Sequence, residues 1–324
     1  MRKIVFALIL LLAAASSLAG CSSSGETNEA KNGKLKIYTT IFPLEDFTKK
    51  IGGNLVEVES VYPPNTDAHS FEPSTKTMVK IAEGDAFIYT GAGIEGFADK
   101  AAETLKNEDV EIVKAAEGIE LAKSAAHSHE GEAGHDEHSE EAAHEGHEHG
   151  DTDPHVWLDP IRSIQMGENI KNALVKKHPE GKETFEKNFA ALKADLEKLD
   201  KEYKDTLSKT DKKEILVSHA AYGYWQERYG IEQISVMGLS ASDEPSQKQI
   251  SAIIKDAKAH GIKHVIFEKN ISSKLSEIVQ NEIGATPLTV SNLESVTEKD
   301  AKNSEDYFSL MRKNLETMKI ALTE

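Results

Sequence analysis

Residues 185–207 read FEKNFAALKADLEKLDKEYKDTL and divide the chain into two halves. The apolar residues of this stretch recur at intervals of three and four, which is the period of one face of an α-helix. They are Phe185, Phe189, Leu192, Leu196, Leu199, Tyr203 and Leu207. We predict one helix over residues 181–210, about 40 Å long at a rise of about 1.5 Å per residue. A dimeric coiled coil could use the same apolar face. The position of this stretch between two similar halves of the chain instead favours a helix that joins two lobes of a monomer.

Short strand patterns alternate with helical patterns on both sides of this helix. The expected strands are 36–41, 56–61, 86–90 and 110–113 before it, and 214–218, 234–237, 263–267 and 286–290 after it. Strands that alternate with helices form parallel sheets covered by those helices. We therefore predict an α/β fold with two β/α lobes, residues 35–180 and 211–324, joined by one long rigid helix.

The first 20 residues have the pattern of an export signal: two basic residues, an apolar run and a small-residue cleavage site. Cys21 follows directly and is the only cysteine, which excludes an intramolecular disulfide and a cysteine-rich zinc site. A lone cysteine at this point resembles the acylated first residue of bacterial lipoproteins. We predict that residues 21–34 form a lipidated, polar tether that holds the protein at the extracytoplasmic face of the cell membrane.

The formal charge of the chain is −17, with 55 acidic residues against 38 lysines and arginines. Binding to nucleic acid requires clustered basic side chains, so a nucleic-acid partner is not expected. Much of the acidic excess lies in a low-complexity insertion, residues 122–152. This segment lacks the apolar residues needed for a core, but it can chelate metal weakly at many points. Its seven histidines are His127, His129, His135, His138, His144, His147 and His149.

Four side chains outside this insertion have the positions expected of tight metal ligands. His69 follows the strand 56–61, His219 follows the strand 214–218, and Glu294 follows the strand 286–290. Ligands of open parallel sheets bind beyond the carboxyl ends of the strands. His155 stands between two turn signals and beside apolar residues that can hold it rigidly. Three neutral imidazoles and one carboxylate suit Zn²⁺, and we expect the site between the two lobes.

Other residues near these positions leave alternatives open. Glu268 also follows a strand, and Asp243 and Glu244 lie in the loop after another. These acids could instead orient ligand imidazoles from outside the metal's own ligand set. The remaining histidines read more simply as surface or core residues; they are His178, His260 and His264.

Several motifs occur in order along the chain: Cys21 after the export signal, DAHSFEP at 67–73, the acidic His-rich insertion, DPHVWLDP at 153–160, SHAAYGY at 218–224 and NLE at 292–294. Together they resemble the zinc-specific substrate-binding lipoproteins of bacterial ABC importers, over essentially the whole mature chain. The resemblance implies Zn²⁺ held between two lobes by His69, His155 and His219, with Glu294 or a water as the fourth ligand. It also implies delivery of the ion to a membrane permease driven by a cytoplasmic ATPase.

Three other functions fit parts of the sequence. A receptor for manganese or another divalent metal would share the fold, but manganese-binding relatives carry a glutamate at the position of His219 and an aspartate near that of Glu294. A zinc hydrolase would use Glu294 as general base, yet the chain has no His-Glu-x-x-His helix. A metal buffer or surface adhesin would rely on the His-rich insertion and would have many weak sites. We therefore expect a non-enzymatic receptor.

Overall fold

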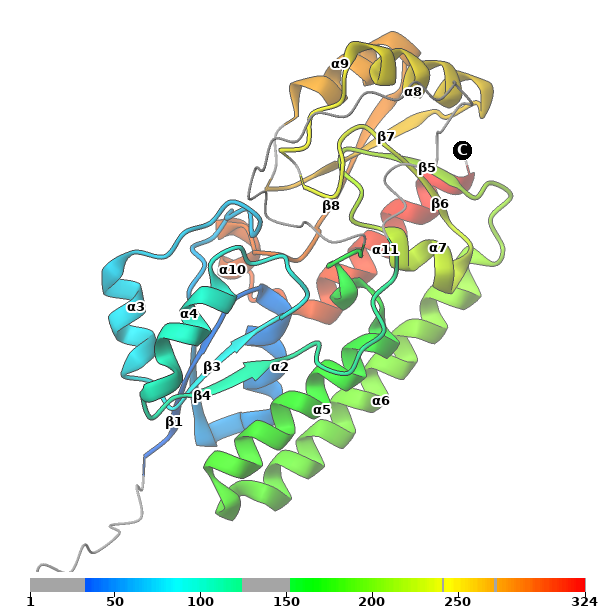
Figure 1. Cartoon of the computed structure of the whole chain (residues 1–324). Coiled ribbons are helices and arrows are strands. Elements are labelled where there is room, and N and C mark those ends of the chain that lie inside the picture. The colour runs from blue at the N-terminus through cyan, green and yellow to red at the C-terminus, as the bar shows by residue number, and fades with distance from the viewer. Residues whose placement is uncertain (1–32, 124–151, 241, 271–272, 324) are drawn as a thin grey trace, which may run out of the picture. The chain divides into compact units, whose positions relative to one another are not determined.

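The computed structural model describes residues 33–123, 152–240, 242–270 and 273–323 (Figure 1). The export signal, Cys21 and the seven histidines of the insertion lie outside the described residues. Within the described part, no helix is both long enough and apolar enough to cross a membrane.

Two four-stranded parallel sheets form the framework of the molecule, which confirms the predicted fold class. The first sheet contains β1 (Leu35–Thr39), β2 (Val56–Ser60), β3 (Ala86–Tyr89) and β4 (Glu111–Lys114), in the order β2-β1-β3-β4. The second contains β5 (Glu214–Val217), β6 (Glu232–Ser235), β7 (His264–Glu268) and β8 (Thr286–Val290), in the order β6-β5-β7-β8. The two halves therefore repeat one topology.

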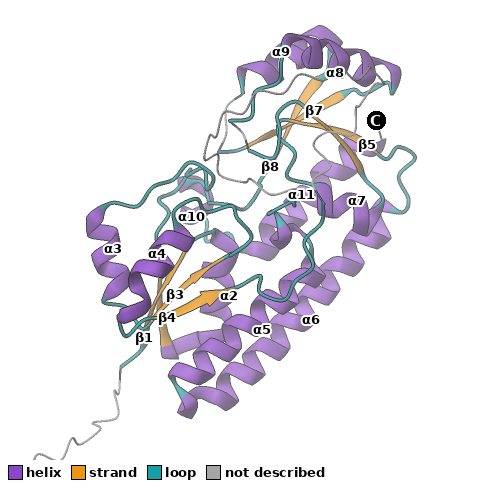
Figure 2. Cartoon of the chain, viewed as in Figure 1, coloured by secondary structure: helices purple, strands orange, loops and turns teal. Residues whose placement is uncertain are grey.

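Helices flank both sheets (Figure 2). The α-helices are α2 (Phe42–Gly52), α3 (Thr75–Ala82), α4 (Ala98–Thr104), α5 (Pro160–Lys177), α6 (Lys182–Leu207), α7 (Gly223–Tyr229), α8 (Gln247–Ala259), α9 (Lys274–Ile283), α10 (Glu298–Lys302) and α11 (Tyr307–Thr323). Short 3-10 turns are η1 (Gly53–Leu55), η2 (Leu105–Asn107), η3 (Val156–Leu158) and η4 (Pro179–Gly181). Every connection between consecutive strands of these two sheets thus contains an α-helix, as parallel pairing requires.

The predicted joining helix is present as α6, which has 26 residues. Its apolar seam is buried: Phe185, Leu192, Leu196, Leu199, Tyr203 and Leu207. The seam packs against α5, α2 and α11 of the same chain, and α5 and α6 lie side by side (Figure 1). Because burial of a large apolar side chain stabilises a fold by about 1.5–3 kcal/mol, these contacts fix α6 between the two sheets.

One strand differs from its sequence expectation. The pattern at 234–237 predicts a strand there, but β6 begins at Glu232 and ends at Ser235. Val236 and Met237 are buried beyond its end, where their N–H groups bond to the carbonyls of Val217 and Ser218. Both side chains are buried in the apolar cluster between the second sheet and the helices α8 and α9, so apolar character alone placed the strand two residues too late.

The C-terminal part of the chain contacts both halves. After β8, the N–H of Asn65 donates to the carbonyl of Val296 at 3.0 Å, and Lys50 of α2 pairs with Asp306 at 3.0 Å. A continuous apolar core runs from the first sheet through α5 and α6 to α11. A smaller apolar cluster lies between the second sheet and the helices α8 and α9. Residues Lys34–Glu324 form one compact unit, and the lobe boundaries at residues 180 and 211 remain predictions.

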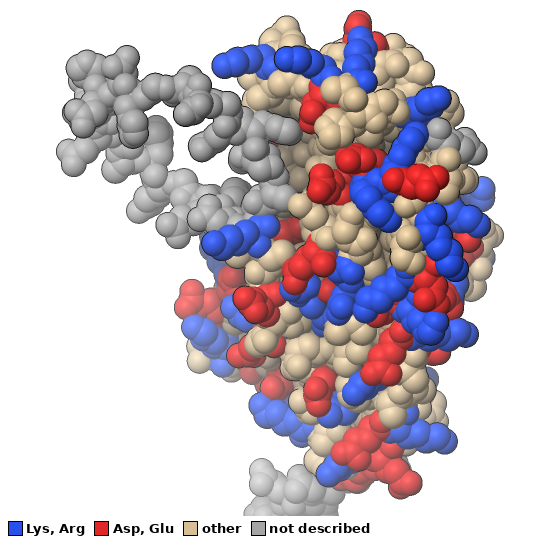
Figure 3. Space-filling view, turned by 90° about the vertical axis from the view of Figure 1, so that its right-hand side faces the viewer, with Lys and Arg blue, Asp and Glu red and all other residues tan. Residues whose placement is uncertain are grey.

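Charges of both signs are interleaved on the face drawn in Figure 3. On α6 the acidic and basic side chains pair one helical turn apart, in the pairs Lys182–Glu186, Lys193–Glu197 and Lys201–Asp205. Such exposed pairs keep a helix surface solvated and contribute little to stability.

Candidate metal centre

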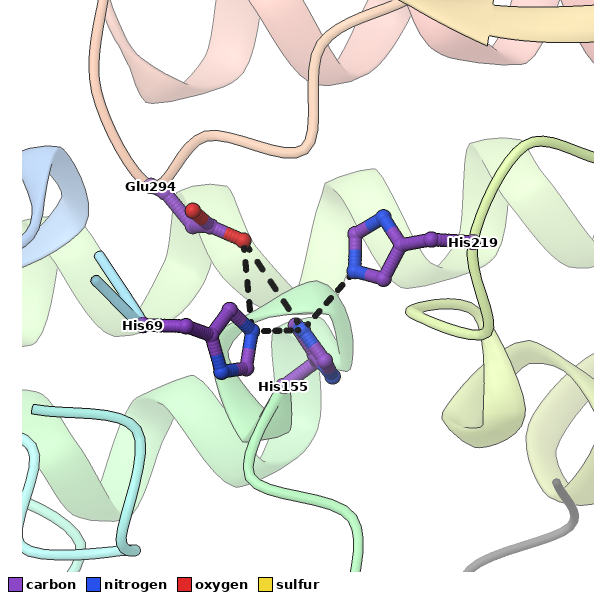
Figure 4. A group of neighbouring side chains, drawn as sticks. All are labelled: His69, His155, His219 and Glu294. Atoms are coloured by element: carbon purple, nitrogen blue, oxygen red, sulfur yellow. Dashed lines mark hydrogen bonds and ion pairs between the residues drawn. The ribbon is translucent and has the colours of Figure 1, made fainter. Parts of the chain in front are cut away.

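Four side chains from four separate segments converge on one point between the two sheets (Figure 4). His69 comes from the loop after β2, His155 precedes η3, His219 follows β5, and Glu294 follows β8. One nitrogen or oxygen of each lies within 4.8 Å of the others. These are the four residues that the sequence singled out as candidate ligands.

Four of the six separations between the donor atoms are close to the edges of a zinc tetrahedron, and the others are at most 4.8 Å. The Nε2 atom of His155 lies 3.4 Å from that of His69 and 3.2 Å from that of His219. The Oε1 atom of Glu294 lies 3.8 Å from Nε2 of both His69 and His155. Four donors at the usual zinc distances of about 2.0–2.1 Å would be about 3.3 Å apart. The side chains therefore surround a space that an ion of this size fits.

The backbone around His155 is held by aromatic side chains from distant parts of the chain. The Nε1–H group of Trp225 donates to the carbonyl of Leu158 at 2.9 Å, and the hydroxyl of Tyr307 donates to that of Trp157 at 2.7 Å. At the start of α5, buried Asp159 caps the helix and pairs with two arginines. The apolar run of this motif is therefore a rigid support for its histidine.

A buried aspartate orients the imidazole of His155. Oδ1 of Asp153 lies 2.8 Å from Nδ1 of His155 and also accepts the backbone N–H of His155 at 2.9 Å. This contact places a hydrogen on Nδ1 and turns the lone pair of Nε2 toward the other donors. Burial, and then the nearby charge of His219, lower the pKa of His155 well below its usual value. Burial also raises the pKa of Asp153 to about 7. His155 is therefore neutral, as a metal ligand must be.

Glu268, the last residue of β7, forms an ion pair with His219 rather than a well-aligned hydrogen bond. Its Oε1 atom lies 2.7 Å from Nδ1 of His219 and accepts the hydroxyl of Tyr222 at 2.9 Å. Burial lowers the pKa of His219, but the Glu268 carboxylate outweighs burial and the pKa is raised to about 9. Without metal, His219 therefore carries a proton at neutral pH.

Glu294 is fully buried and uses its two oxygens differently. Oε2 accepts the backbone N–H of Ala68 at 3.0 Å, which links it to the loop that bears His69. Oε1 points toward the imidazoles and accepts no hydrogen bond from the described residues. Burial raises the pKa of Glu294 to about 8. A buried oxygen without a donor costs free energy, and a cation in the centre would remove that cost.

His69 is the one member of the group that reaches solvent. Its side chain is 11% exposed, whereas those of His155, His219 and Glu294 are fully buried. The backbone N–H of His69 donates to Oδ1 of Asp67 at 3.1 Å, which fixes the turn that carries it. Among the four candidate ligands, His69 is therefore the one that solvent contacts.

The structure also separates the alternatives that the sequence left open. Glu268 contacts an imidazole of the group, while Asp243 accepts the N–H of Ser240 within its own loop and Glu244 is exposed. The other histidines of the described part lie outside the group; they are His178, His260 and His264. Sequence reasoning missed the roles of Asp153 and Tyr222. The spacing of Asp153, two residues before His155, is the signal that could have identified the first.

Comparison with known families gives one match over most of the chain. Residues 37–321 match the family model ZnuA, described as zinc-uptake complex component A, periplasmic.

Several relatives share this similarity. The zinc-binding protein AdcA of Streptococcus pyogenes is 41% identical over 288 residues, 89% of this chain, and this chain spans 56% of the AdcA length. The high-affinity zinc uptake system protein ZnuA of Bacillus subtilis is 33% identical over 319 residues, which cover 98% of this chain and 96% of that protein. The crystal structure of the Zn(II)-bound ZnuA-like domain of Streptococcus pneumoniae AdcA is similar at a TM-score of 0.73, with 34% identity, and covers 90% of this chain and 100% of that domain.

Proposed function

Because this chain belongs to the ZnuA family of zinc-uptake components, we propose that it is an extracytoplasmic receptor that captures Zn²⁺ for import. The ligands in this proposal are His69, His155, His219 and Glu294. The observation that supports it most directly is the convergence of their donor atoms within 4.8 Å, with Oε1 of Glu294 buried and lacking a hydrogen bond.

The chemistry of the donors favours zinc over manganese. Three imidazole nitrogens and one carboxylate oxygen form a borderline set, whereas manganese prefers oxygen ligands and more of them. Tetrahedral coordination by four protein donors is the usual arrangement of zinc sites that hold the ion rather than activate it. Asp153 and Glu268 add the buried carboxylates that orient two of the imidazoles.

The same geometry supports a receptor rather than a hydrolase. A catalytic zinc keeps one position open for water or substrate, but here a fourth protein donor, Glu294, faces that position. Three of the four side chains are fully buried, and His69 is the one of the four with solvent-exposed atoms. In this proposal Zn²⁺ is cargo, and its exchange requires the loop of His69 to move away.

The remaining parts of the proposal concern where the protein acts and with which partners. We infer that Cys21 carries a lipid anchor, that the chain acts as a monomer, and that a membrane permease with a cytoplasmic ATPase accepts the ion. Replacing Cys21 with alanine should release the protein from the membrane into the surrounding fluid, as fractionation and immunoblotting would detect. Retention of the variant in the membrane fraction would contradict the anchor.

Calorimetric titration with Zn²⁺ and Mn²⁺, together with elemental analysis of the purified protein, tests the central claim. We expect one tight Zn²⁺ per chain and weaker binding of Mn²⁺. The zinc-loaded protein should not cleave ester or peptide substrates faster than a His155→Ala variant. Tight binding of Mn²⁺ in place of Zn²⁺, or cleavage that depends on His155, would contradict the proposal.

A further inference from the structure

The turn that carries Glu294 contains a second fully buried polar side chain, Asn292. Its Oδ1 atom accepts the backbone N–H of Glu294 at 3.1 Å. Its Nδ2 atom donates to Oε2 of Glu268 at 3.1 Å. Its backbone carbonyl accepts Nε1–H of Trp157 at 2.8 Å. Asn292 thus contacts Glu294, the carboxylate that orients His219, and the segment that follows His155.

Only an amide side chain satisfies both contacts at this position. Glu268 is a carboxylate and needs a donor, whereas the backbone N–H of Glu294 needs an acceptor, and an amide offers one of each. The opposite orientation of the amide would set oxygen against oxygen and donor against donor, so the hydrogen bonds fix a single orientation. An aspartate at position 292 would place a second carboxylate beside Glu268, and an alanine would leave both partners buried and unpaired.

The backbone between Asn292 and Glu294 is strained. Leu293 has a φ of 61°, in the left-handed region that a leucine rarely adopts, and its side chain is fully buried. Such conformations persist only where the surrounding structure holds them. The turn is held on one side by Ser291, whose Oγ accepts the N–H of Leu293 at 3.3 Å, and on the other by the contact of Asn292 with the N–H of Glu294. This turn aims the carboxylate of Glu294 at the imidazoles.

We propose that Asn292 is a positioning residue for the metal site. It sets the place of Glu294 relative to the imidazoles and, through Glu268, the orientation of His219. The proposal rests on the function inferred above, because it requires His219 and Glu294 to bind the same ion. Asn292 itself does not touch that ion. Its removal should therefore change the geometry around the metal as well as the stability of the turn.

Asn314 provides a matched control. It lies on α11, is buried, and also makes two hydrogen bonds to this turn: Oδ1 accepts the N–H of Ser291 at 2.9 Å and Nδ2 donates to the carbonyl of Ser291 at 2.7 Å. It has no hydrogen bond to Glu268 or Glu294. Removing either amide leaves buried backbone groups of the same turn unpaired, so both changes should lower the melting temperature of the metal-free protein.

The experiment compares Asn292→Ala and Asn292→Asp with Asn314→Ala and Asn314→Asp. Zn²⁺ affinity is measured by competition with a chelator, and coordination by the visible spectrum of bound Co²⁺, which absorbs more strongly with four ligands than with five or six. We expect both Asn292 variants to lose about 10–100-fold in Zn²⁺ affinity, which is the usual effect of removing a residue that hydrogen-bonds to metal ligands without touching the metal. Their Co²⁺ spectra should weaken, because a displaced Glu294 lets more than one water bind and raises the number of ligands to five or six. The Asn314 variants should keep the wild-type spectrum.

Each result separates the two levels of inference. If Asn292→Asp, which keeps the size of the side chain, matches the Asn314 variants in spectrum and affinity, the positioning role is wrong and Asn292 is merely structural. If the wild-type protein itself binds neither ion tightly, the proposed function fails, and the positioning role fails with it. A weak spectrum in the Asn292 variants alone, beside a strong one in the wild type, supports both.

Discussion

Two buried imidazole–carboxylate pairs, one in the segment 153–160 and the other at the ends of β5 and β7, have nearly the same separation, but only the first has the angles of a hydrogen bond. Nδ1 of His155 lies 2.8 Å from Asp153, and Nδ1 of His219 lies 2.7 Å from Glu268. Their protonation differs, because the pKa of His155 is well below its usual value while that of His219 is raised to about 9.

The difference arises from the surroundings of each carboxylate. Burial raises the pKa of Asp153 to about 7, so Asp153 is only partly charged near neutral pH and does little to favour a proton on its histidine. The carboxylate of Glu268, which also accepts hydrogen bonds from Tyr222 and Asn292, raises the pKa of His219. Hence the imidazole of His155 is already neutral and can bind metal directly, whereas the imidazole of His219 must lose a proton when the ion binds.

The largest loss of Zn²⁺ affinity is expected when a proposed ligand imidazole is removed, and little loss when a histidine outside the site is removed. Replacing His155 or His219 with alanine should lower Zn²⁺ affinity by more than the roughly 100-fold upper range for outer partners, because a donor to the ion is lost. His260→Ala is the control, since His260 is exposed and lies beside Glu214 at the start of β5, whereas His219 follows the end of that strand. Calorimetry measures all three, and an equal effect of His260→Ala would argue against the ligand assignment.

The next largest loss of Zn²⁺ affinity is expected when one of the carboxylates beside the ligand imidazoles, Asp153 or Glu268, is removed. Asp153→Asn and Glu268→Gln should each cost about 10–100-fold in Zn²⁺ affinity at pH 8. Glu268→Gln should lower the Zn²⁺ affinity more than Asp153→Asn. The NH2 group of the new glutamine would face either the Nδ2 donor of Asn292 or the groups now at Oε1, which are the hydroxyl of Tyr222 and Nδ1 of His219. In both orientations a donor would face a donor. Chelator competition ranks the two variants, and a larger loss in Asp153→Asn would reverse the expected order.

The pH dependence of binding should reveal the proton on His219. A raised pKa means that the proton is bound at pH 7 and must leave Nε2 before the ion can bind, so affinity rises with pH and levels off near pH 9. Each proton released changes the apparent affinity about tenfold per pH unit. Glu294, with a pKa of about 8, adds to the rise below pH 8.

The two carboxylate variants sharpen this expectation. Glu268→Gln should shift the levelling to lower pH, because the carboxylate that raises the pKa of His219 is gone. Asp153→Asn should leave the profile between pH 7 and 9 nearly unchanged, since His155 is already neutral there. Calorimetry in buffers of different ionisation enthalpy counts the protons released. Identical profiles for both variants would show that the two pairs do not differ as described.

The smallest effect is expected from removal of residues 124–151. The residues that flank this segment are already adjacent, because Lys123 and Thr152 form an antiparallel bridge and the N–H of Asp153 donates to the carbonyl of Ala122. Joining Lys123 to Thr152 should therefore leave Asp153 and His155 in place and the tight Zn²⁺ event unchanged. Calorimetry should show that only the weak Zn²⁺ binding is lost. Loss of the tightly bound Zn²⁺ would mean that the insertion supplies a ligand.

The sequence by itself determined the two β/α halves, the joining helix and the candidate donors. These features depend on local signals: the helical period of residues 185–207, the alternation of strands and helices, and the rule that ligands lie beyond the carboxyl ends of parallel strands. The contact of His155 with Asp153 is also local, because both residues lie in one short motif, but its role became visible only in the structure.

Only the tertiary structure decided which acid lies beside the imidazole of His219 and which of the imidazoles carries a proton. Glu268, Asp243 and Glu244 all follow strands, and nothing local distinguishes them, but parallel pairing of β5 with β7 places Glu268 alone beside the imidazole. The contacts of Asn292 likewise join residues far apart in the chain. The opposite pKa shifts of His155 and His219 follow from burial and from neighbouring charges in space, which chain order does not reveal.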